Sequence, residues 1–340
     1  MEKGYATAEG TARYAARFAP QEQNGFYRQV NSLTLSTVGI GSYLGAMDDA
    51  TDTSYAAAMA EAVRGGINFI DTSLNYRNQR SEVSIGAALT ALFQTGGARR
   101  EEVAVCTKAG YLVPGAIPQG LLHQEDVVGN MHSMKPAFLE DQLERSRRNL
   151  GLETIDVFYL HNPETQLRFV SQDEFHRRIE EAFMACERFV AEGRIRYYGT
   201  ATWDGYRQDG QLSLPTLEEI ARKAGGAQHK FRFIQMPFNL AMLEALSKGI
   251  TVQARKLGIA VIASASLLQS RLASGLPETL GQALQGPSSD AGRALQFARS
   301  GPGIDVALVG MSQPEHVRAN LEASSYPPLD EEQFLKLFGK

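Results

Sequence analysis

Short apolar runs alternate with amphipathic helical runs along most of the chain, beginning with the segment Leu33–Ser42 (LTLSTVGIGS). The apolar runs are rich in β-branched residues, which is typical of parallel strands buried on both faces. The strands that this pattern predicts are Ser36–Gly41, Ile67–Asp71, Val103–Thr107, Ile155–Leu160, Ile195–Thr200, Phe233–Gln235, Ala260–Ser264 and Asp305–Val309.

Helical periodicity fills the intervals between these strands, and several of the helical runs stop at a glycine, as expected for helix C-caps. The helices that the pattern predicts are Tyr55–Arg64, Glu82–Phe93, Ala137–Asn149, Glu174–Ala191, Thr216–Lys223, Ala241–Lys256, Asp290–Ala298 and Pro314–Glu322. The last of these begins with Pro314, a residue favoured in the first turn of a helix.

Eight strands that alternate with eight helices predict a single α/β domain, a closed (β/α)8 TIM barrel. An open, doubly wound sheet is the alternative, and it would need a glycine-rich phosphate loop leading into a helix after the first strand. Here Gly39-Ile40-Gly41 is followed by Ser-Tyr-Leu-Gly, and we expect no helix in the next stretch, residues 46–53. We therefore place the barrel at residues 31–325, after an N-terminal tail or strap (1–30) and before a C-terminal segment (326–340).

Two long connections interrupt the alternation, Gly110–Lys135 after the third strand and Ala265–Ser289 after the seventh. Both follow the carboxyl end of a strand, and active sites of such barrels are built on that face. Loops of this length usually act as lids or specificity loops. The alternative is an insertion without a function.

Composition restricts the possible partners and compartments of the 340-residue chain. Its net charge is −4 and it has no basic tail, so we expect no nucleic acid as a partner. We find no signal-peptide core and no run of about 20 apolar residues, which predicts a soluble, cytoplasmic protein without membrane contact. The two cysteines, Cys106 and Cys186, suit a reducing compartment.

Polar side chains with catalytic potential stand at the carboxyl ends of successive strands. Asp71 ends the second strand and Tyr76 follows it, Lys108 follows the third, His161 the fourth, and Gln235 ends the sixth. Each alone has an ordinary structural explanation, such as a helix cap, a solvated lysine or a structural histidine. Because a barrel brings these ends to one mouth, we expect the side chains to meet there.

Together these groups predict a site for proton transfer. An ammonium beside a tyrosine lowers the pKa of the phenol, and a carboxylate paired with the lysine keeps the lysine charged. Tyr76 would then act as general acid or base, while His161 would polarise a substrate oxygen. Since no side chain supplies a hydride, the site would need a redox cofactor.

The chain resembles the aldo-keto reductase superfamily in several motifs that occur in the family's order over residues 30–325. The matching stretches are Gly66–Arg77 (GINFIDTSLNYR), Arg80–Leu89 (RSEVSIGAAL), Cys106–Tyr111 (CTKAGY), Asp156–Pro163 (DVFYLHNP), Gly193–Trp203 (GRIRYYGTATW), Phe233–Leu240 (FIQMPFNL) and Asp305–Ser324 (DVALVGMSQPEHVRANLEAS). The resemblance implies a catalytic tetrad of Asp71, Tyr76, Lys108 and His161.

The resemblance also implies a nicotinamide dinucleotide that is bound without a Rossmann fold. Its expected contacts are Gly41, Ser42, Tyr43, Thr202, Gln235, Ser264, Gly310, Ser312, His316 and Asn320. The expected substrate pocket comprises Leu74, Tyr111, Asn162, Trp203 and Phe238, with Tyr43 and the loop around Met131 and His132 beside it.

The cofactor is expected to be NADP(H) or NAD(H), with a slight preference for NADP(H) that comes from the family. The positions that would face a 2′-phosphate, Gly310–Ser312 and His316, carry no Lys or Arg. Arg318 would point to another face of its helix, whereas Arg271 on the second long loop could reach the cofactor. The chain also has Ala201-Thr202 and Ser264 where the family often has Ser-Asn and a stacking tyrosine.

The function predicted for the chain is an NAD(P)(H)-dependent oxidoreductase, an alcohol or sugar dehydrogenase in the broad sense. It would interconvert a small-molecule carbonyl (aldehyde, ketone or sugar) and an alcohol. One alternative is a cofactor-binding regulatory module with slow or no turnover, and another is a barrel lyase or isomerase without a nicotinamide cofactor. We expect no metal site, because His123 and His132 are nine residues apart in a loop without acidic partners.

Overall fold

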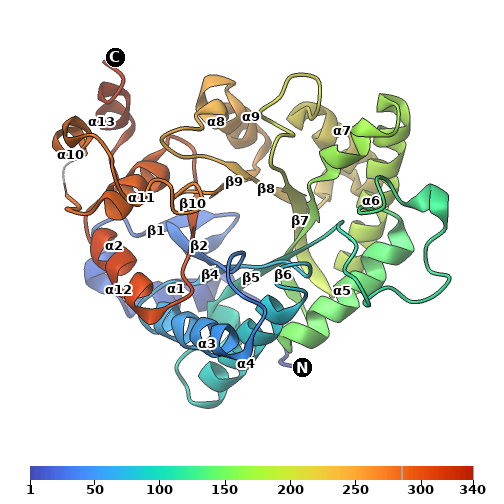
Figure 1. Ribbon diagram of the computed structural model, residues 1–340, viewed down its shortest axis with the longest axis horizontal. Helices are drawn as coiled ribbons and strands as arrows, with labels where there is room; N and C mark the ends of the chain where they lie inside the picture. Colours follow the sequence, from blue (N-terminus) through green and yellow to red (C-terminus); the bar gives the residue numbers. More distant parts are fainter. Residues whose placement is uncertain (285, 340) are drawn as a thin grey trace.

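A closed barrel of parallel strands occupies the centre of the computed structural model, which describes residues 1–284 and 286–339 (Figure 1). The strands follow one another around the barrel in chain order, and the last pairs with the first in parallel. The barrel strands are β3 (Val38–Gly41), β4 (Phe69–Asp71), β5 (Ala104–Ala109), β6 (Ile155–His161), β7 (Ile195–Ala201), β8 (Phe231–Pro237), β9 (Ala260–Ser264) and β10 (Val306–Gly310). The predicted (β/α)8 barrel is therefore confirmed.

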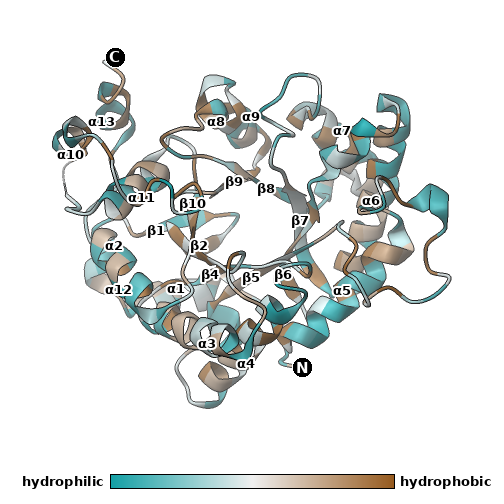
Figure 2. Ribbon diagram, in the orientation of Figure 1, coloured by the Kyte–Doolittle hydropathy of each residue, from teal (hydrophilic) through white to brown (hydrophobic). Residues whose placement is uncertain are grey.

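Amphipathic helices surround the barrel and cover its strands, with the hydrophilic residues gathered on the outer faces in Figure 2. The helices between and after the barrel strands are α3 (Asp49–Arg64), α4 (Arg80–Gln94), α5 (Pro136–Leu150), α6 (Gln172–Ala191), α7 (Leu214–Gly225), α8 (Glu244–Ser247), α9 (Ile250–Leu257), α11 (Asp290–Ser300) and α12 (Pro314–Ala323). Short 3-10 turns are η1 (Arg100–Glu102), η2 (Gln124–Asp126), η3 (Pro163–Arg168) and η4 (Gly226–Gln228).

Two helix predictions are wrong in their bounds. Helix α3 begins at Asp49, inside the stretch 46–53 that was expected to be non-helical, because the side chain of Asp48 accepts a hydrogen bond from the Thr51 amide. The first turn is polar and exposed, so it carries no hydrophobic periodicity. The single helix expected over Ala241–Lys256 is divided in two by Gly249, whose φ of +67° belongs to the left-handed region.

The first thirty residues, which the sequence analysis treats as a tail or strap, contain regular secondary structure. They contain α1 (Ala8–Ala16), α2 (Ala19–Gln23) and β1 (Tyr27–Val30), which pairs antiparallel with β2 (Leu33–Ser36). Val30 and Leu35 on this hairpin pack against residues inside the barrel such as Phe69. The hairpin therefore closes the barrel at the amino ends of its strands. The hairpin pairs residues on both sides of residue 30, where the sequence analysis places the start of the barrel domain. That domain boundary stays a prediction.

A buried ion pair lies at the same end of the barrel, and its carboxylate also binds the N-terminal segment. The guanidinium of Arg100 donates to Asp156 Oδ2 at 2.6 Å, and both side chains are almost fully buried. The carboxylate also accepts the amide protons of Ala6 at 2.7 Å and Val105 at 2.8 Å. Three donors, from Ala6 of the N-terminal segment, from η1 and from β5, therefore converge on one side chain of β6.

The two long connections lie at the carboxyl ends of β5 and β9. Residues 110–135 contain η2, and residues 265–289 contain the helix α10 (Glu278–Ala283). After α12, the helix α13 (Glu331–Lys336) packs through Phe334, whose ring centroid lies 4.9 Å from that of Phe297 on α11. Among the helices of residues 1–284 and 286–339, none has the length and apolar character needed to cross a bilayer.

Candidate active site

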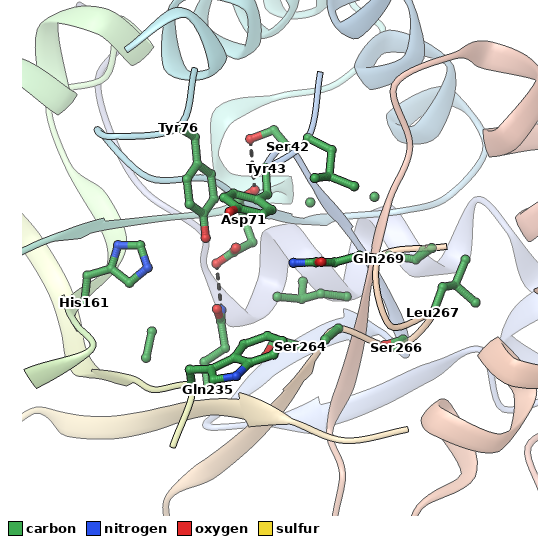
Figure 3. A pocket seen from close by; sticks show the side chains of 18 of the residues that line it. Ser42, Tyr43, Asp71, Tyr76, His161, Gln235, Ser264, Ser266, Leu267 and Gln269 are labelled. Carbon is green, nitrogen blue, oxygen red and sulfur yellow. Dashed lines mark hydrogen bonds between the residues drawn. The ribbon is translucent and has the colours of Figure 1, made fainter. Parts of the chain in front are cut away.

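A pocket of about 430 Å³ opens at the carboxyl ends of the barrel strands. Residues from the ends of β3, β4 and β6 to β10, and from the connections that follow them, form its walls. Figure 3 shows several of these side chains directed toward the centre of the cavity. The barrel therefore brings residues that lie far apart in the chain to one cavity, as the sequence analysis expects.

Lys108 does not line this pocket itself, but it contacts two lining residues, Asp71 and Tyr76, which are other members of the predicted tetrad. Its ammonium donates to Asp71 Oδ2 at 2.5 Å, to the Thr72 carbonyl at 2.8 Å and to the Tyr76 hydroxyl at 3.3 Å. The lysine and the aspartate are buried. A buried ammonium needs such partners because it has lost its hydration.

Burial and the ion pair act in opposite directions on the pKa values of this group. Burial alone would lower the pKa of Lys108, but Asp71 and Tyr76 raise it above its usual value, so the lysine is charged. Burial raises the pKa of Asp71, while Lys108 lowers it in part. Burial likewise raises the pKa of Tyr76 more than Lys108 lowers it. The sequence argument considered only the lysine, and in the structure Tyr76 holds its proton at neutral pH.

His161 is the last residue of strand β6, and its ring lies beside that of Tyr76. The two ring centroids are 5.8 Å apart in an edge-on arrangement, and His161 Nδ1 lies 3.1 Å from the hydroxyl of Ser73. Burial lowers the pKa of His161 well below its usual value, and the charge of Lys108 acts in the same direction. The imidazole is therefore neutral, and it faces the pocket together with Tyr76.

Gln235, near the end of β8, is a further hydrogen-bond partner of Asp71. Its amide donates to Asp71 Oδ1 at 2.8 Å (Figure 3). The two carboxylate oxygens of Asp71 therefore accept from different side chains, Gln235 and Lys108. Ser42, at the end of β3, donates to the Thr72 hydroxyl at 2.9 Å, and the ring of Tyr43 packs against that of Tyr76 at 5.0 Å.

The structure separates the expected cofactor contacts into two groups. The first group lines the pocket and consists of Gly41, Ser42, Tyr43, Thr202, Gln235, Ser264 and Gly310. The second group, Ser312, His316 and Asn320, lies on the connection to α12 and on that helix, outside the lining. Of these, Asn320 is buried in the helix packing and Ser312 accepts the hydroxyl proton of Ser54 through its carbonyl at 2.6 Å.

The sequence analysis missed most of the wall formed by the connection after β9. Ser266, Leu267, Gln269 and Ser270 all line the pocket, whereas only Ser264 was expected there. The backbone is unusual in this segment, since φ is +53° at Gln269 and +69° at Ser270. Left-handed conformations at non-glycine residues are not visible in a hydrophobic pattern. The length of the loop was the available signal.

Two of the expected substrate residues do not reach the pocket, and this corrects the sequence prediction. Leu74 is buried against Val113 and Ala116 of the first long connection. Phe238 stacks on Phe297, with ring centroids 5.6 Å apart. Gln235 faces the barrel interior, and a residue three positions further along an extended chain points to the opposite face. Phe238 therefore belongs to the layer between strands and helices.

The remaining expected substrate residues, Tyr111, Asn162 and Trp203, line the pocket. The amide of Asn162 donates to the Tyr111 hydroxyl at 3.0 Å. Trp203 lies on the loop after β7, whose backbone is held by Glu164: one carboxylate oxygen accepts the amide protons of Trp203 at 3.0 Å and Gly205 at 3.2 Å. Of the loop residues beside this set, Met131 is half exposed and His132 is fully buried, and neither lines the cavity.

Metal-ligating side chains do not cluster in the part of the chain that the structure describes: no group of three or more His, Cys, Asp or Glu residues is placed to hold an ion there. Both ring nitrogens of His132 lie close to hydrogen-bonding partners within the protein, namely Gln166 and the carbonyl of His161.

Residues 37–290 match the sequence model of a family described as the Aldo/keto reductase family. Over 195 residues the chain is 30% identical to an NADH-specific methylglyoxal reductase of Escherichia coli (strain K12), an alignment that covers 54% of this chain and 54% of that protein. Over 174 residues it is 26% identical to a probable voltage-gated potassium channel subunit beta of Arabidopsis thaliana, covering 51% of this chain and 44% of that protein. The chain thus matches about half the length of these curated relatives.

Among solved structures, the barrel resembles an aldo/keto reductase from Klebsiella pneumoniae in complex with NADP and acetate. The TM-score is 0.66 and the sequence identity is 19%, over 92% of this chain and 94% of that chain. At this level of identity the likeness concerns the fold.

Proposed function

Because the chain belongs to the aldo/keto reductase family, we propose that it is an NAD(P)(H)-dependent oxidoreductase that interconverts a carbonyl and an alcohol. The substrate is a small-molecule aldehyde, ketone or sugar, and Tyr76 is its general acid and base. The observation that carries this proposal is the position of the Lys108 ammonium, 2.5 Å from Asp71 and 3.3 Å from the Tyr76 hydroxyl.

The pocket has features that fit a polar cofactor. The hydroxyls of Thr202 and Ser266 are buried without a hydrogen-bond partner among the described residues, although both residues line the cavity. A buried hydroxyl without a partner is costly, and a ligand with many acceptor oxygens would satisfy it. Thr202, Ser264, Ser266 and Gly310 would hold a nicotinamide dinucleotide along this wall, and that cofactor supplies a hydride when bound.

The residues of the chain manage the proton and the developing charge. In reduction, Tyr76 donates its proton to the substrate oxygen, and the charged Lys108 stabilises the phenolate that remains. The neutral His161 contributes a polar ring beside the same oxygen. Asp71 keeps the lysine charged, so Tyr76, Lys108 and Asp71 work as one unit. In oxidation the same tyrosine accepts the proton.

The lining of the pocket suits an uncharged substrate. Among the described lining residues Asp71 is the one charged side chain, and it is paired with Lys108. An anionic substrate would find no arginine or lysine on this surface. The faces of Tyr43 and Trp203, together with the amide of Asn162, offer apolar contact and hydrogen bonds. Neutral carbonyl compounds, including sugars, match this combination.

The cofactor proposed is NADP(H) or NAD(H), with a slight preference for NADP(H). One similar structure is described as a complex with NADP, and one relative is described as NADH-specific. The alternative function, a cofactor-binding regulatory subunit with slow turnover, is supported by the similarity to the potassium channel subunit beta. The intact group of Tyr76, Lys108 and Asp71 favours the enzyme.

Fluorescence titration of the purified protein with NADH and NADPH tests the proposed cofactor, and a screen of aldehydes, ketones and sugars then tests turnover. We expect saturable binding of at least one cofactor and oxidation or reduction of some member of the screen. Binding without turnover of any compound would favour the regulatory alternative. Absence of binding to both cofactors would contradict the proposed function altogether.

A further inference from the structure

A chain of hydrogen bonds runs from helix α6 to the end of strand β6, where His161 stands. Arg178 Nη1 donates to Gln166 Oε1 at 2.7 Å. Gln166 Nε2 lies 2.9 Å from His132 Nδ1, and His132 Nε2 lies 2.8 Å from the carbonyl oxygen of His161. Gln166 and His132 are fully buried. None of the three residues lines the pocket.

The two ends of this chain fix the direction of every bond in it. A guanidinium can only donate and a carbonyl oxygen can only accept. Gln166 must therefore accept with its oxygen and donate with its nitrogen. His132 in turn accepts at Nδ1 and donates from Nε2, which is one defined tautomer of a neutral ring. Burial lowers the pKa of His132 to about 4, in agreement with that state.

The chain of bonds ends where two segments of the site meet. His132 lies on the first long connection, residues 110–135, and its partner carbonyl ends β6. Gly110, the first residue of that connection, allows the contact: a Cβ there would lie 2.6 Å from His132 Nε2 and 2.7 Å from the His161 carbonyl oxygen. Arg178 also donates to the Glu125 carbonyl at 3.2 Å, so it contacts the same connection directly as well as through Gln166.

The neighbouring pocket wall depends on this junction. The ring of Tyr111 lies edge-on to His132 at 5.3 Å and edge-on to His161 at 5.0 Å. Its hydroxyl accepts the amide proton of Asn162, a residue held at a φ of +47°. A displacement of His132 would therefore move both Tyr111 and the end of β6 relative to Tyr76.

We propose that Arg178, Gln166 and His132 form a one-way hydrogen-bond relay that fixes residues 110–135 against the end of β6 and thereby positions His161 and Tyr111 in the pocket. This inference rests on the proposed function for its effect on turnover. The three are positioning residues, because they act on the substrate only through His161 and Tyr111.

The relay makes a kinetic prediction with a matched control on the same helix. Arg177 and Arg178 are adjacent, and both form ion pairs with Glu174. Arg178→Met cuts the relay, whereas Arg177→Met removes only exposed ion pairs. We expect Arg178→Met and Gln166→Met to lower kcat/KM roughly tenfold, with KM raised, because one buried hydrogen bond is worth about that factor. Arg177→Met should stay within about twofold of the wild type, and the cofactor Kd should be unchanged in all three variants.

The tautomer of His132 tests the relay without any turnover. Long-range 1H–15N spectra of the wild-type protein at pH 7 should show His132 protonated at Nε2 and unprotonated at Nδ1, with the signals assigned by their loss in His132→Gln. In Gln166→Met the Nδ1 signal should shift, since its donor is gone.

Two results would overturn the relay: an Nδ1-protonated or doubly protonated His132 in the wild type, or equal loss of kcat/KM in Arg177→Met and Arg178→Met. Because the spectra need neither cofactor nor substrate, they remain decisive if the protein shows no oxidoreductase activity. In that case the proposed function fails and the relay is judged on the tautomer alone. Thermal unfolding of each variant identifies any that does not fold.

Discussion

The ammonium of Lys108 lies 3.3 Å from the hydroxyl oxygen of Tyr76 and 4.8 Å from the centroid of its ring. At such a distance the charge favours the phenolate, while the surrounding burial favours the neutral phenol. Burial has the larger effect on the pKa of Tyr76, which is raised. The resting site therefore holds a protonated acid beside a charge that will stabilise its conjugate base.

Tyr76→Phe should remove turnover and leave cofactor binding nearly intact. The variant keeps the ring that packs against Tyr43 and loses only the proton donor. General acid catalysis contributes about 10²–10⁴ in rate, so we expect kcat to fall by at least a hundredfold. Steady-state kinetics and a cofactor titration measure the two effects. More than a third of wild-type kcat, with chemistry shown to limit the rate, would contradict the role of Tyr76.

Lys108→Met should abolish most activity and change its pH dependence. Lys108 lowers the pKa of Tyr76 against the larger effect of burial. Without the lysine that pKa rises further, so alcohol oxidation, which needs the phenolate, should begin at a higher pH than in the wild type. The pH–rate profile of the residual oxidation measures this shift. An unchanged profile would show that the lysine does not control the proton on Tyr76.

The same variant should also be less stable, with a defined dependence on pH. Burial raises the pKa of Asp71, and loss of its lysine partner raises it more. The folded variant then holds a proton that the unfolded chain releases above about pH 4. The loss of stability relative to the wild type should therefore be smallest at low pH and grow as the pH rises through the folded pKa of Asp71 in the variant. Thermal unfolding of both proteins from pH 4 to pH 8 tests this direction, and a Tm difference that shrinks as the pH rises would contradict it.

The preference between NADPH and NADH should be smaller than a hundredfold. Arg or Lys usually holds a 2′-phosphate, yet Arg318 is occupied by Glu315 at 2.6 Å and Glu61 at 3.2 Å. Dissociation constants for both cofactors at pH 6.5 and pH 8 decide the matter. A hundredfold preference for NADPH at pH 8 would point to Arg271, whose replacement by Met should then remove it.

Arg100→Met should destabilise the fold without a specific effect on the pocket. It leaves the Asp156 carboxylate buried with two amide donors and no counter-charge. Loss of one partner of a buried pair typically costs about 3–5 kcal/mol. Arg222→Met, which breaks an exposed pair with Glu218, is the control and should cost less than about 1 kcal/mol. Denaturant unfolding measures both, and equal costs would show that burial of the Arg100 pair has no effect.

The hydrophobic pattern predicted the barrel because each strand carries its own local signal. Strand β9 has the bounds that the sequence indicated, and the others differ by a few residues at their ends. The polar residues at strand ends were predictable too, since a closed barrel leaves them only one place to converge. Asp71, Tyr76 and Lys108 meet for this reason, although their catalytic roles stay predictions.

Features that depend on contacts between distant segments were not predictable from local patterns. The N-terminal helix α1 is rich in alanine and polar residues, and it is held by Tyr14, whose hydroxyl bonds to the Ile67 carbonyl at 3.2 Å. The direction of Leu74 depends on a turn, and the backbone of Gln269 has a positive φ that no spacing rule indicates. The contact of His132 with the His161 carbonyl joins residues 29 positions apart, with helix α5 between them in the chain.

The pairing of β10 with β3 has a consequence for how the chain is made. Leu308 lies beside Gly39 in this pair, so the first barrel strand finds its second neighbour only when nearly the whole chain is available. During translation, the free edge of β3 and the apolar side of the β1–β2 hairpin stay unpaired until the later segments have been synthesised. Such long-range closure slows folding and leaves strand edges open to aggregation. We therefore expect the yield of native protein to depend on chaperones and on growth temperature more than on any residue of the pocket.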